Sequence, residues 1–302
     1  MSDPTPFSVW SADVLARTEA ALDELLPRPG GAPALSRLHE GMRHAVLEGG
    51  KRVRPLLAHA AGELTDAPQA ALGRAGCAVE LVHAYSLVHD DMPCMDNDVL
   101  RRGKPTVHVA YGEALAMLVG DALQALAFRA VAEAGALGVP AGAVVRMCAE
   151  LADAAGSVGM AGGQAIDLDA VGASPTRDAL EDMHRRKTGA MLRASVRLGA
   201  WCGEPLDAAG AAALDVYCDA VGLAFQVVDD VLDVEADSAT LGKTAGKDAA
   251  NDKPTYVSLM GLDGARRLAA DLRTQAHDSL AGFGMRGGRL LALADLIVAR
   301  RS

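Results

Sequence analysis

The apolar residues of this chain recur at intervals of three and four over most of its length, which is the period of amphipathic α-helices. The alternating pattern that indicates β-strands is missing. Helices are expected at residues 13–26, 35–47, 53–64, 69–92, 113–135, 141–156, 176–201, 207–234 and 263–281. Glycine and proline clusters separate them, and none is long enough to be a linker. The pattern predicts a single all-α domain over residues 1–302.

Composition and charge narrow the class of protein. With 302 residues, half of them hydrophobic, the chain can bury a large core. Its formal net charge of −10 argues against a general binder of nucleic acid or of anionic membranes, because such proteins present a basic face. The five cysteines form no C-x-x-C pair, which is typical of reduced intracellular thiols.

The N-terminal residues show neither the basic start nor the apolar run of a signal peptide. No apolar stretch approaches the roughly 18 residues of a membrane-spanning helix. We therefore expect a cytoplasmic protein without stable membrane insertion and without a nucleic-acid partner.

The segment VHDDMPCMDNDVLRRG, residues 88–103, crowds four aspartates into nine positions. Carboxylates this close raise one another's pKa and repel, unless cations bind between them. On a helix, His83 and Asp90 lie two turns apart, roughly 10 Å, so both can line one cavity. This spacing predicts that the helix supplies one ligand of a cation site.

Pro93 follows directly and disfavours helix at Met92. Asp96 and Asp98 are therefore expected on an irregular segment that folds back toward Asp90. The loop would supply the second ligand.

A second acidic cluster is FQVVDDVLDV, residues 225–234. Asp229 and Asp233 are four apart and share a helix face, and Gln226 lies about one turn upstream. Oxygen-only ligands suit Mg²⁺ or Mn²⁺ rather than zinc, and Mg²⁺ commonly binds carboxylates together with substrate phosphates. Two such clusters facing each other would form a site for magnesium and a diphosphate.

Basic residues concentrate in four glycine-containing segments, which are EGGKRVRP, RRGKP, HRRKTG and LGKTAGKDAANDKPTY. Arginine offers phosphate a two-pronged fork and lysine a point charge. In an acidic protein, this placement predicts an anionic small-molecule substrate with more than one phosphate group.

These segments carry a resemblance to the trans-prenyltransferases of the isoprenyl diphosphate synthase family, and within it to the bacterial farnesyl diphosphate synthases, or geranyltranstransferases. The matching pieces lie in family order across roughly residues 40–260: GGKRVRP, HAYSLVHDDMPCMDNDVLRRGKPT, GDALQALAF, GGQAIDLD, HRRKTGAM, GLAFQVVDDVLDV, TLGKTAGKD and KPTY. The ordered set is far more specific than any single piece.

The resemblance implies a bundle of about ten or more helices around a central cavity, usually as a homodimer. It implies head-to-tail condensation of isopentenyl diphosphate with dimethylallyl or geranyl diphosphate, mainly to farnesyl diphosphate. Three Mg²⁺ ions, replaceable by Mn²⁺, would take part. Their ligands would be Asp90, Asp96, Asp229 and Asp233.

The same resemblance assigns the substrate contacts. The allylic diphosphate would be held by Arg101, Lys187, Lys243 and, less strongly, Lys253. The isopentenyl diphosphate pocket would consist of Gly50, Lys51, Arg54, His83 and Arg102. Thr188 and Gln226 would steady an allylic cation with their oxygen dipoles, and Arg300 and Arg301 resemble a basic tail that closes over the site.

Product length in the family follows the residues five and four before the first aspartate motif, here Tyr85 and Ser86. Tyr85 would floor a pocket for a C15 product, and Pro93 and Cys94 correspond to the two-residue insertion of the bacterial farnesyl type. Helical geometry places Ser86 on the face of Asp90 but Tyr85 well off it.

Each feature taken alone has an ordinary explanation. A single acidic turn or basic cluster is more often a solvated surface, and His83 alone is more often an ordinary helix histidine. Their conjunction on one helical frame favours the synthase.

Four alternatives remain. A geranylgeranyl or geranyl diphosphate synthase belongs to the same family. A helical His-Asp phosphohydrolase would use His83, His89 and His108 with Asp90, but leaves the second acidic cluster unexplained. A non-catalytic subunit would be expected to lose the aspartate motifs, and a terpene cyclase would lack the complete isopentenyl diphosphate pocket.

Overall fold

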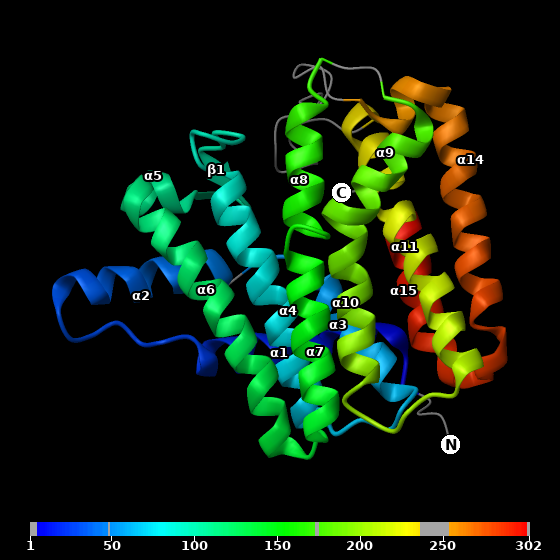
Figure 1. Cartoon of the computed structure of the whole chain (residues 1–302), viewed down its shortest axis with the longest axis horizontal. Coiled ribbons are helices and arrows are strands. Elements are labelled where there is room, and N and C mark those ends of the chain that lie inside the picture. The colour runs from blue at the N-terminus through cyan, green and yellow to red at the C-terminus, as the bar shows by residue number, and fades with distance from the viewer. Residues whose placement is uncertain (1–4, 48, 173–174, 236–253, 301–302) are drawn as a thin grey trace.

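The computed structural model describes residues 5–47, 49–172, 175–235 and 254–300 (Figure 1). Its α-helices are α1 (Phe7–Leu25), α2 (Pro33–Val46), α3 (Val53–Glu63), α4 (Gln69–Asp90), α5 (Val107–Tyr111), α6 (Glu113–Glu133), α7 (Ala141–Ala155), α8 (Met160–Asp169), α9 (Arg177–His184), α10 (Ala190–Ala200), α11 (Ala208–Glu235), α14 (Tyr256–Ser279) and α15 (Gly288–Ala299). Short 3₁₀ or π segments are η1 (Ala134–Leu137), η2 (Arg185–Gly189) and η3 (Ala281–Gly287). The strands β1 (Leu100–Arg101) and β2 (Lys104–Pro105) form a small antiparallel hairpin, so the predicted all-α class is confirmed.

The predicted helices exist, but two of them begin earlier than expected. α1 starts at Phe7 rather than at 13. α14 starts at Tyr256 rather than at 263, after a capping box between Thr255 and Ser258. Gly261 has a φ of 73° and kinks this helix, so the regular hydrophobic period begins only after it.

Three further helices, α5, α8 and α15, were not predicted from the hydrophobic pattern. The buried face of α8 consists of Met160, Gly163 and Asp167, so it carries little hydrophobic pattern. α15 has the helical period in its buried residues, which include Leu290, Leu293 and Ile297, and was detectable.

The helix predicted at 176–201 contains an interruption. α9 and α10 are joined by the π-helical segment η2, whose sequence is RRKTG. The side chain of Thr176 caps α9 by accepting a hydrogen bond from the backbone N–H of Ala179 at 3.3 Å. A π segment inside an α-helix is frequent at functional sites.

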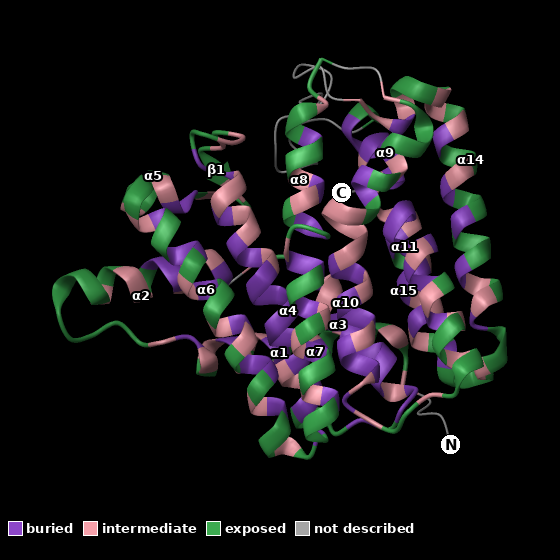
Figure 2. Cartoon of the chain, viewed as in Figure 1, coloured by how far each residue is buried: buried purple, intermediate pink, exposed green. Residues whose placement is uncertain are grey.

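Two hydrophobic clusters meet at α10. One is built mainly from α4, α6 and α7, and the other from α3, α11, α14 and α15. α10 turns Met191, Ala194 and Leu198 into the first cluster and Leu192 and Val196 into the second. Figure 2 shows buried residues concentrated along the central helices.

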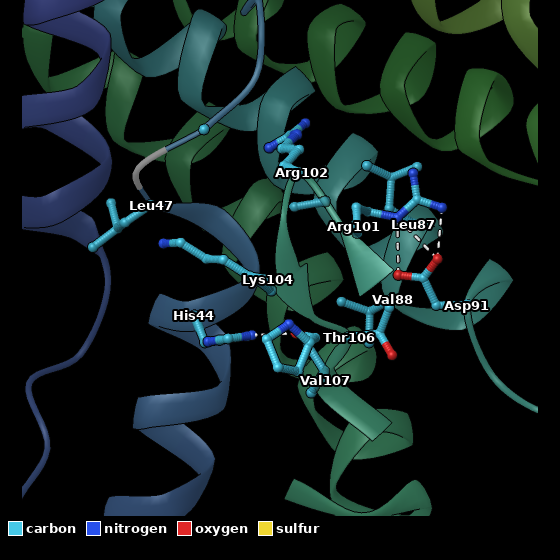
Figure 3. Close-up of a pocket in the computed structure, with 14 residues that line it drawn as sticks. His44, Leu47, Leu87, Val88, Asp91, Arg101, Arg102, Lys104, Thr106 and Val107 are labelled. Atoms are coloured by element: carbon cyan, nitrogen blue, oxygen red, sulfur yellow. Dashed lines mark hydrogen bonds and ion pairs between the residues drawn. The ribbon is translucent and has the colours of Figure 1, made fainter. Parts of the chain in front are cut away.

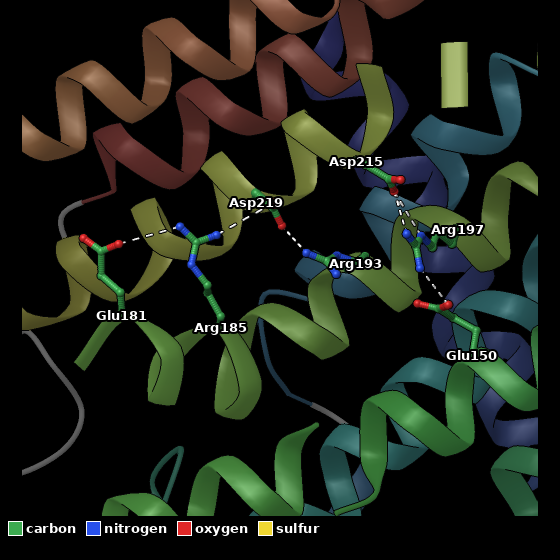
Figure 4. A network of polar contacts seen from close by, with 7 residues as sticks. All are labelled: Glu150, Glu181, Arg185, Arg193, Arg197, Asp215 and Asp219. Carbon is green, nitrogen blue, oxygen red and sulfur yellow. Dashed lines mark hydrogen bonds and ion pairs between the residues drawn. The ribbon is translucent and has the colours of Figure 1, made fainter. Parts of the chain in front are cut away.

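Ion pairs near the surface connect α10 with α7 and α11 (Figure 4). Arg197 of α10 contacts Glu150 of α7 at 2.9 Å and Asp215 of α11 at 2.8 Å. Arg193 is paired with Asp219 one turn further along. Arg185 lies 3.9 Å from the same Asp219, so the network links α10 and α11 to the π segment.

Two helical stretches, Glu113–Leu137 and Ala208–Glu235, are long and apolar enough to span a membrane, contrary to the expectation that no stretch approaches that length. Both contribute to the hydrophobic clusters, and the second carries the acidic cluster at 225–234. Core helices of globular proteins often pass the same test.

The carboxyl ends of α4 and α11, which carry the two aspartate clusters, lie toward the same end of the bundle, near the top of Figure 1. The β1–β2 hairpin lies at this end as well.

Candidate active site

The first aspartate cluster begins where α4 ends, at Asp90. The chain turns after it, and the backbone N–H of Asp96 donates to the carbonyl of Asp90 at 2.9 Å, so the predicted return of the loop is confirmed. Burial raises the pKa of the Asp90 carboxyl to about 6; Lys187 opposes the rise and Asp96 adds to it. The acidic loop and the π segment therefore face one another.

Asp91, for which the sequence predicted no role, anchors Arg101. The Arg101 Nε lies 2.9 Å from both carboxylate oxygens, and Nη2 lies 2.6 Å from Oδ1 (Figure 3). Asp98 lies 3.8 Å from the same Nη2. The Asp91 side chain is buried, so this two-pronged contact fixes the direction of the guanidinium. The sequence offered a sign of this ion pair, because Asp91 lies next to Asp90 and two arginines follow the aspartate cluster.

Arg102 packs against the backbone of Gly50. Gly50 has a φ of +92°, and a Cβ there would lie 2.6 Å from Nη2 and 2.7 Å from Cζ of Arg102. Any side chain at this position would displace the guanidinium. The glycine therefore brings the segments GGKR and LRRG together.

Other residues predicted for the isopentenyl diphosphate pocket lie around Gly50 and Arg102. Burial lowers the pKa of His83 well below its usual value, and Arg54 and Arg102 lower it further, so His83 is neutral among cations. Burial likewise lowers the pKa of Lys51, with Arg300 adding to the effect and Asp229 opposing it. The Arg54 Nε is buried without a hydrogen-bond partner among the described residues. The pocket therefore concentrates positive charge that has few protein counter-charges.

Several basic residues considered for phosphate binding are used elsewhere. Arg52 is buried and contacts Glu80 at 2.7 Å and Glu19 at 2.9 Å. Arg186 contacts Asp182 at 2.8 Å on the surface. These contacts indicate structural roles.

The second cluster lies on α11, and its three aspartates differ in environment. The Asp229 Oδ1 lies 2.9 Å from Nη2 of Arg300, whose guanidinium stacks 3.9 Å from the Phe225 ring centre. The Asp230 side chain accepts hydrogen bonds from Gln226 Nε2 at 2.9 Å and from the backbone N–H of Tyr256 at 2.7 Å.

Asp230 therefore positions Gln226 and the start of α14. Asp233 is buried, and its Oδ1 has no donor among the described residues.

The π segment supplies Lys187 and Thr188. The Lys187 Nζ lies 2.6 Å from Oδ2 of the buried Asp167 on α8. Thr188 Oγ1 donates to Gln226 Oε1 at 3.4 Å. Asp167 was missed as a site residue, although it belongs to the GGQAIDLD piece.

A cavity of about 480 Å³ joins Asp90 at the end of α4 to Lys187 and Thr188 of the π segment. It is lined by Arg54, His83, Tyr85, Ser86, Leu87, His89, Asp90, Met95, Met160, Ala161, Gln164, Ala165, Leu168, Lys187, Thr188 and Phe225. Tyr85 and Ser86 both line this cavity. Helical geometry predicted that Tyr85 lies well off the face of Asp90, yet its side chain still reaches the cavity.

The carboxylates suit magnesium. Asp90 and Asp96 lie close enough for Asp96 to raise the pKa of Asp90, and Asp233 has a buried oxygen without a donor among the described residues. All are oxygen ligands, which Mg²⁺ prefers. Within the described ranges, no three acidic, histidine or cysteine side chains form a ready-made metal site.

Three predicted residues, Lys243, Lys253 and Arg301, lie outside the described residues.

Known proteins resemble this chain over most of its length. The polyprenyl synthetase family model matches residues 36–279. A probable farnesyl diphosphate synthase of Bradyrhizobium diazoefficiens is 51% identical over 94% of this chain and 85% of its own. The farnesyl diphosphate synthase of Escherichia coli is 49% identical over 86% of this chain and 88% of its own.

Among solved structures, the apo structure of an FPP/GFPP synthase from Zymomonas mobilis is 39% identical, with a TM-score of 0.85 over 97% of this chain and 99% of that chain. Helix arrangement, family model and sequence identity agree. This chain belongs to the polyprenyl synthetase family.

Proposed function

We propose that this chain is a magnesium-dependent prenyltransferase of the farnesyl diphosphate synthase type. It condenses isopentenyl diphosphate head-to-tail with dimethylallyl or geranyl diphosphate, mainly to farnesyl diphosphate. One observation carries the proposal: a single cavity joins Arg54, His83 and Lys187 to Asp90 and continues between apolar side chains. Such a cavity suits a ligand with an anionic head and a hydrocarbon tail. Relatives about half identical to this chain carry the same name.

The acidic clusters would hold the metal. Asp90, Asp96, Asp229 and Asp233 would bind Mg²⁺, which would stabilise the departing diphosphate as the allylic C–O bond ionises. Arg101, held by Asp91, and Lys187, held by Asp167, would bind oxygens of the allylic diphosphate.

Lys51, Arg54, His83 and Arg102 would hold isopentenyl diphosphate beside Gly50, so that its double bond faces the cation. Thr188 and Gln226 direct oxygens toward the same region and would stabilise positive charge. Apolar side chains such as Met160 and Phe225 exclude water, which would otherwise capture the cation.

The test is incubation of the purified chain with isopentenyl diphosphate, Mg²⁺ and each allylic starter, followed by chromatography of the dephosphorylated prenols. A predominant C15 alcohol is expected. A predominant C20 or C10 alcohol would support the geranylgeranyl or geranyl alternative, and no prenol would contradict the proposal.

The phosphohydrolase alternative finds less support. His89 Nε2 hydrogen-bonds the Met117 carbonyl at 3.2 Å, His108 lies 3.1 Å from Thr106, and His83 lies among arginines. These histidines do not gather around Asp90 as metal ligands would. Phosphate release from nucleotides without isopentenyl diphosphate would reinstate this alternative.

We also propose a cytoplasmic homodimer. Met117 and Leu118 on α6 are 43% and 52% exposed, and Val109 on α5 is 50% exposed. An apolar surface of this kind suits contact with a second copy of the chain. Light scattering after gel filtration should give twice the chain mass, and a monomer would contradict this.

A further inference from the structure

We propose that His89 and Gly120 together determine product length, by forming the wall that supports Tyr85 on the α6 side of the cavity. The inference rests on the proposed function and goes beyond the two positions, Tyr85 and Ser86, that the family resemblance offers. Neither His89 nor Gly120 has a role in the diphosphate chemistry described above.

His89 lies beside Tyr85. The two residues are four apart on α4, and their rings meet edge to face, with centroids 5.8 Å apart and planes at 69°. Both side chains line the cavity. His89 Nε2 lies 3.2 Å from the carbonyl of Met117, which can only accept, so this nitrogen carries the proton. The ring is therefore held on α6 in a fixed orientation.

Gly120 makes this position of His89 sterically accessible. A Cβ on Gly120 would lie 2.0 Å from Nε2, 2.5 Å from Cδ2 and 2.6 Å from Cε1 of His89. Gly120 lies inside α6 and its φ is not positive, so its backbone does not require glycine. A glycine in a helix interior lowers stability by about 1 kcal/mol relative to alanine. The close approach of the imidazole explains why a glycine occupies this position.

The same face of α6 also reaches Tyr85. Gln124, one turn after Gly120, hydrogen-bonds the Tyr85 hydroxyl. Met117, Gly120 and Gln124 are spaced by three and four, so they share one face of α6. Tyr85 thus contacts the His89 ring and is held at its hydroxyl by Gln124, and 8% of the residue is exposed.

The geometry predicts opposite effects for two substitutions. Gly120→Ala places a methyl group where the imidazole lies. The distance from the new Cβ to His89 Nε2 would be 2.0 Å, so the ring must move until this distance reaches an ordinary contact of at least 3.4 Å. Since α6 lies on one side, the ring moves toward Tyr85 and the cavity, which shortens the space for the prenyl chain. His89→Ala removes the support of Tyr85 and lengthens that space.

The experiment measures two quantities separately, the total isopentenyl diphosphate incorporated and the ratio of C10, C15 and C20 products. We expect Gly120→Ala to raise the C10 to C15 ratio about tenfold, and His89→Ala to raise the C20 to C15 ratio about tenfold, in keeping with the discrimination that small volume changes give an apolar pocket. The double variant should lose the C10 shift, because the clash is gone. Gly73→Ala on α4 is the matched control, since nothing lies within 4 Å of its added Cβ.

Product ratios unchanged in both single variants, with incorporation retained, would overturn the inference and leave the proposed function standing. A C10 shift that persists in the double variant would also overturn it, because the effect would not pass through His89. If Gly120→Ala does not fold, His89→Ala decides alone: longer products support the wall, and wild-type products refute it. Absence of any prenol from the unaltered chain would instead refute the proposed function.

Discussion

Asp90 and Asp91 are neighbours in the chain with different surroundings. Asp90 lines the cavity, and burial raises the pKa of its carboxyl to about 6. Asp91 faces away, is 3% exposed, and forms a two-pronged ion pair with Arg101. Under the proposed function, the first would serve as a ligand for a cation and the second would orient a phosphate-binding side chain.

Asp90→Ala and Asp229→Ala should each lower the rate of condensation by at least about 100-fold, because charge stabilisation of the leaving diphosphate is lost. The fold should remain, since removing either carboxylate relieves repulsion. Prenol formation and circular dichroism measure the two effects. Normal turnover in either variant would refute the metal assignment.

Asp91→Asn should raise the KM for the allylic diphosphate and lower kcat/KM about tenfold, because Arg101 loses a charge-assisted partner. Steady-state kinetics with each substrate in turn is the measurement. Asp182→Asn is the matched control, since it removes an exposed ion-pair partner of Arg186 at 2.8 Å, where the contact contributes little to stability. Equal kinetics for the two variants would show that Asp91 does not orient Arg101.

Among the elements, the end of α15 meets the second aspartate cluster of α11. Arg300 follows α15 directly, its side chain is 11% exposed, and it covers both Asp229 and the ring of Phe225. A metal ion bound at Asp229 would compete with this guanidinium. If Asp229 binds the metal as proposed, the C-terminal helix would be coupled to metal binding through Arg300.

Arg300→Gln should tighten binding of Mn²⁺ in the presence of inorganic pyrophosphate by about threefold to tenfold, which corresponds to the energy of a partly exposed ion pair. Titration calorimetry or the Mn²⁺ resonance signal measures this without turnover. Weaker or unchanged Mn²⁺ affinity would contradict competition at Asp229.

For the whole molecule, two buried histidines make stability depend on pH. Burial lowers the pKa of both His59 and His184 to about 4. His59 belongs to α3 and His184 to α9, where its ring stacks on Tyr256 at 5.5 Å. Both must stay neutral in the folded chain.

Above pH 6.5 both histidines are neutral in the folded and unfolded states, and neither lowers stability. As the pH falls from 6.5 toward 4, the unfolded state binds protons that the folded state excludes, so the free energy of unfolding falls, by up to about 3 kcal/mol for each histidine. Denaturant unfolding at pH 7.5 and pH 5 measures this.

His184→Phe should reduce the loss of stability between these two pH values, whereas His39→Gln, at a less buried position, should leave it unchanged. An undiminished loss in His184→Phe would exclude this histidine as a source.

The sequence by itself determined what depends on local period and residue type. The three-and-four spacing predicts an all-α fold, Pro93 ends α4 and returns the chain to Asp90, and the oxygen-rich clusters indicate magnesium rather than zinc. The ordered motifs identified the family. The all-α fold, the return of the chain after α4 and the family are confirmed, because they depend on residue type and on local order along the chain, whereas the metal stays a prediction.

Only the tertiary structure decided which charged side chains line the cavity and which form ion pairs that stabilise the fold. Arg52 and Arg54 are two residues apart, yet one is tied to Glu19 and Glu80 and the other lines the cavity. Asp167 meets Lys187, and His89 lies on Gly120, across pairs of helices that are remote in sequence. Partners of this kind are set by how helices pack, and the period of a single helix contains no information about them.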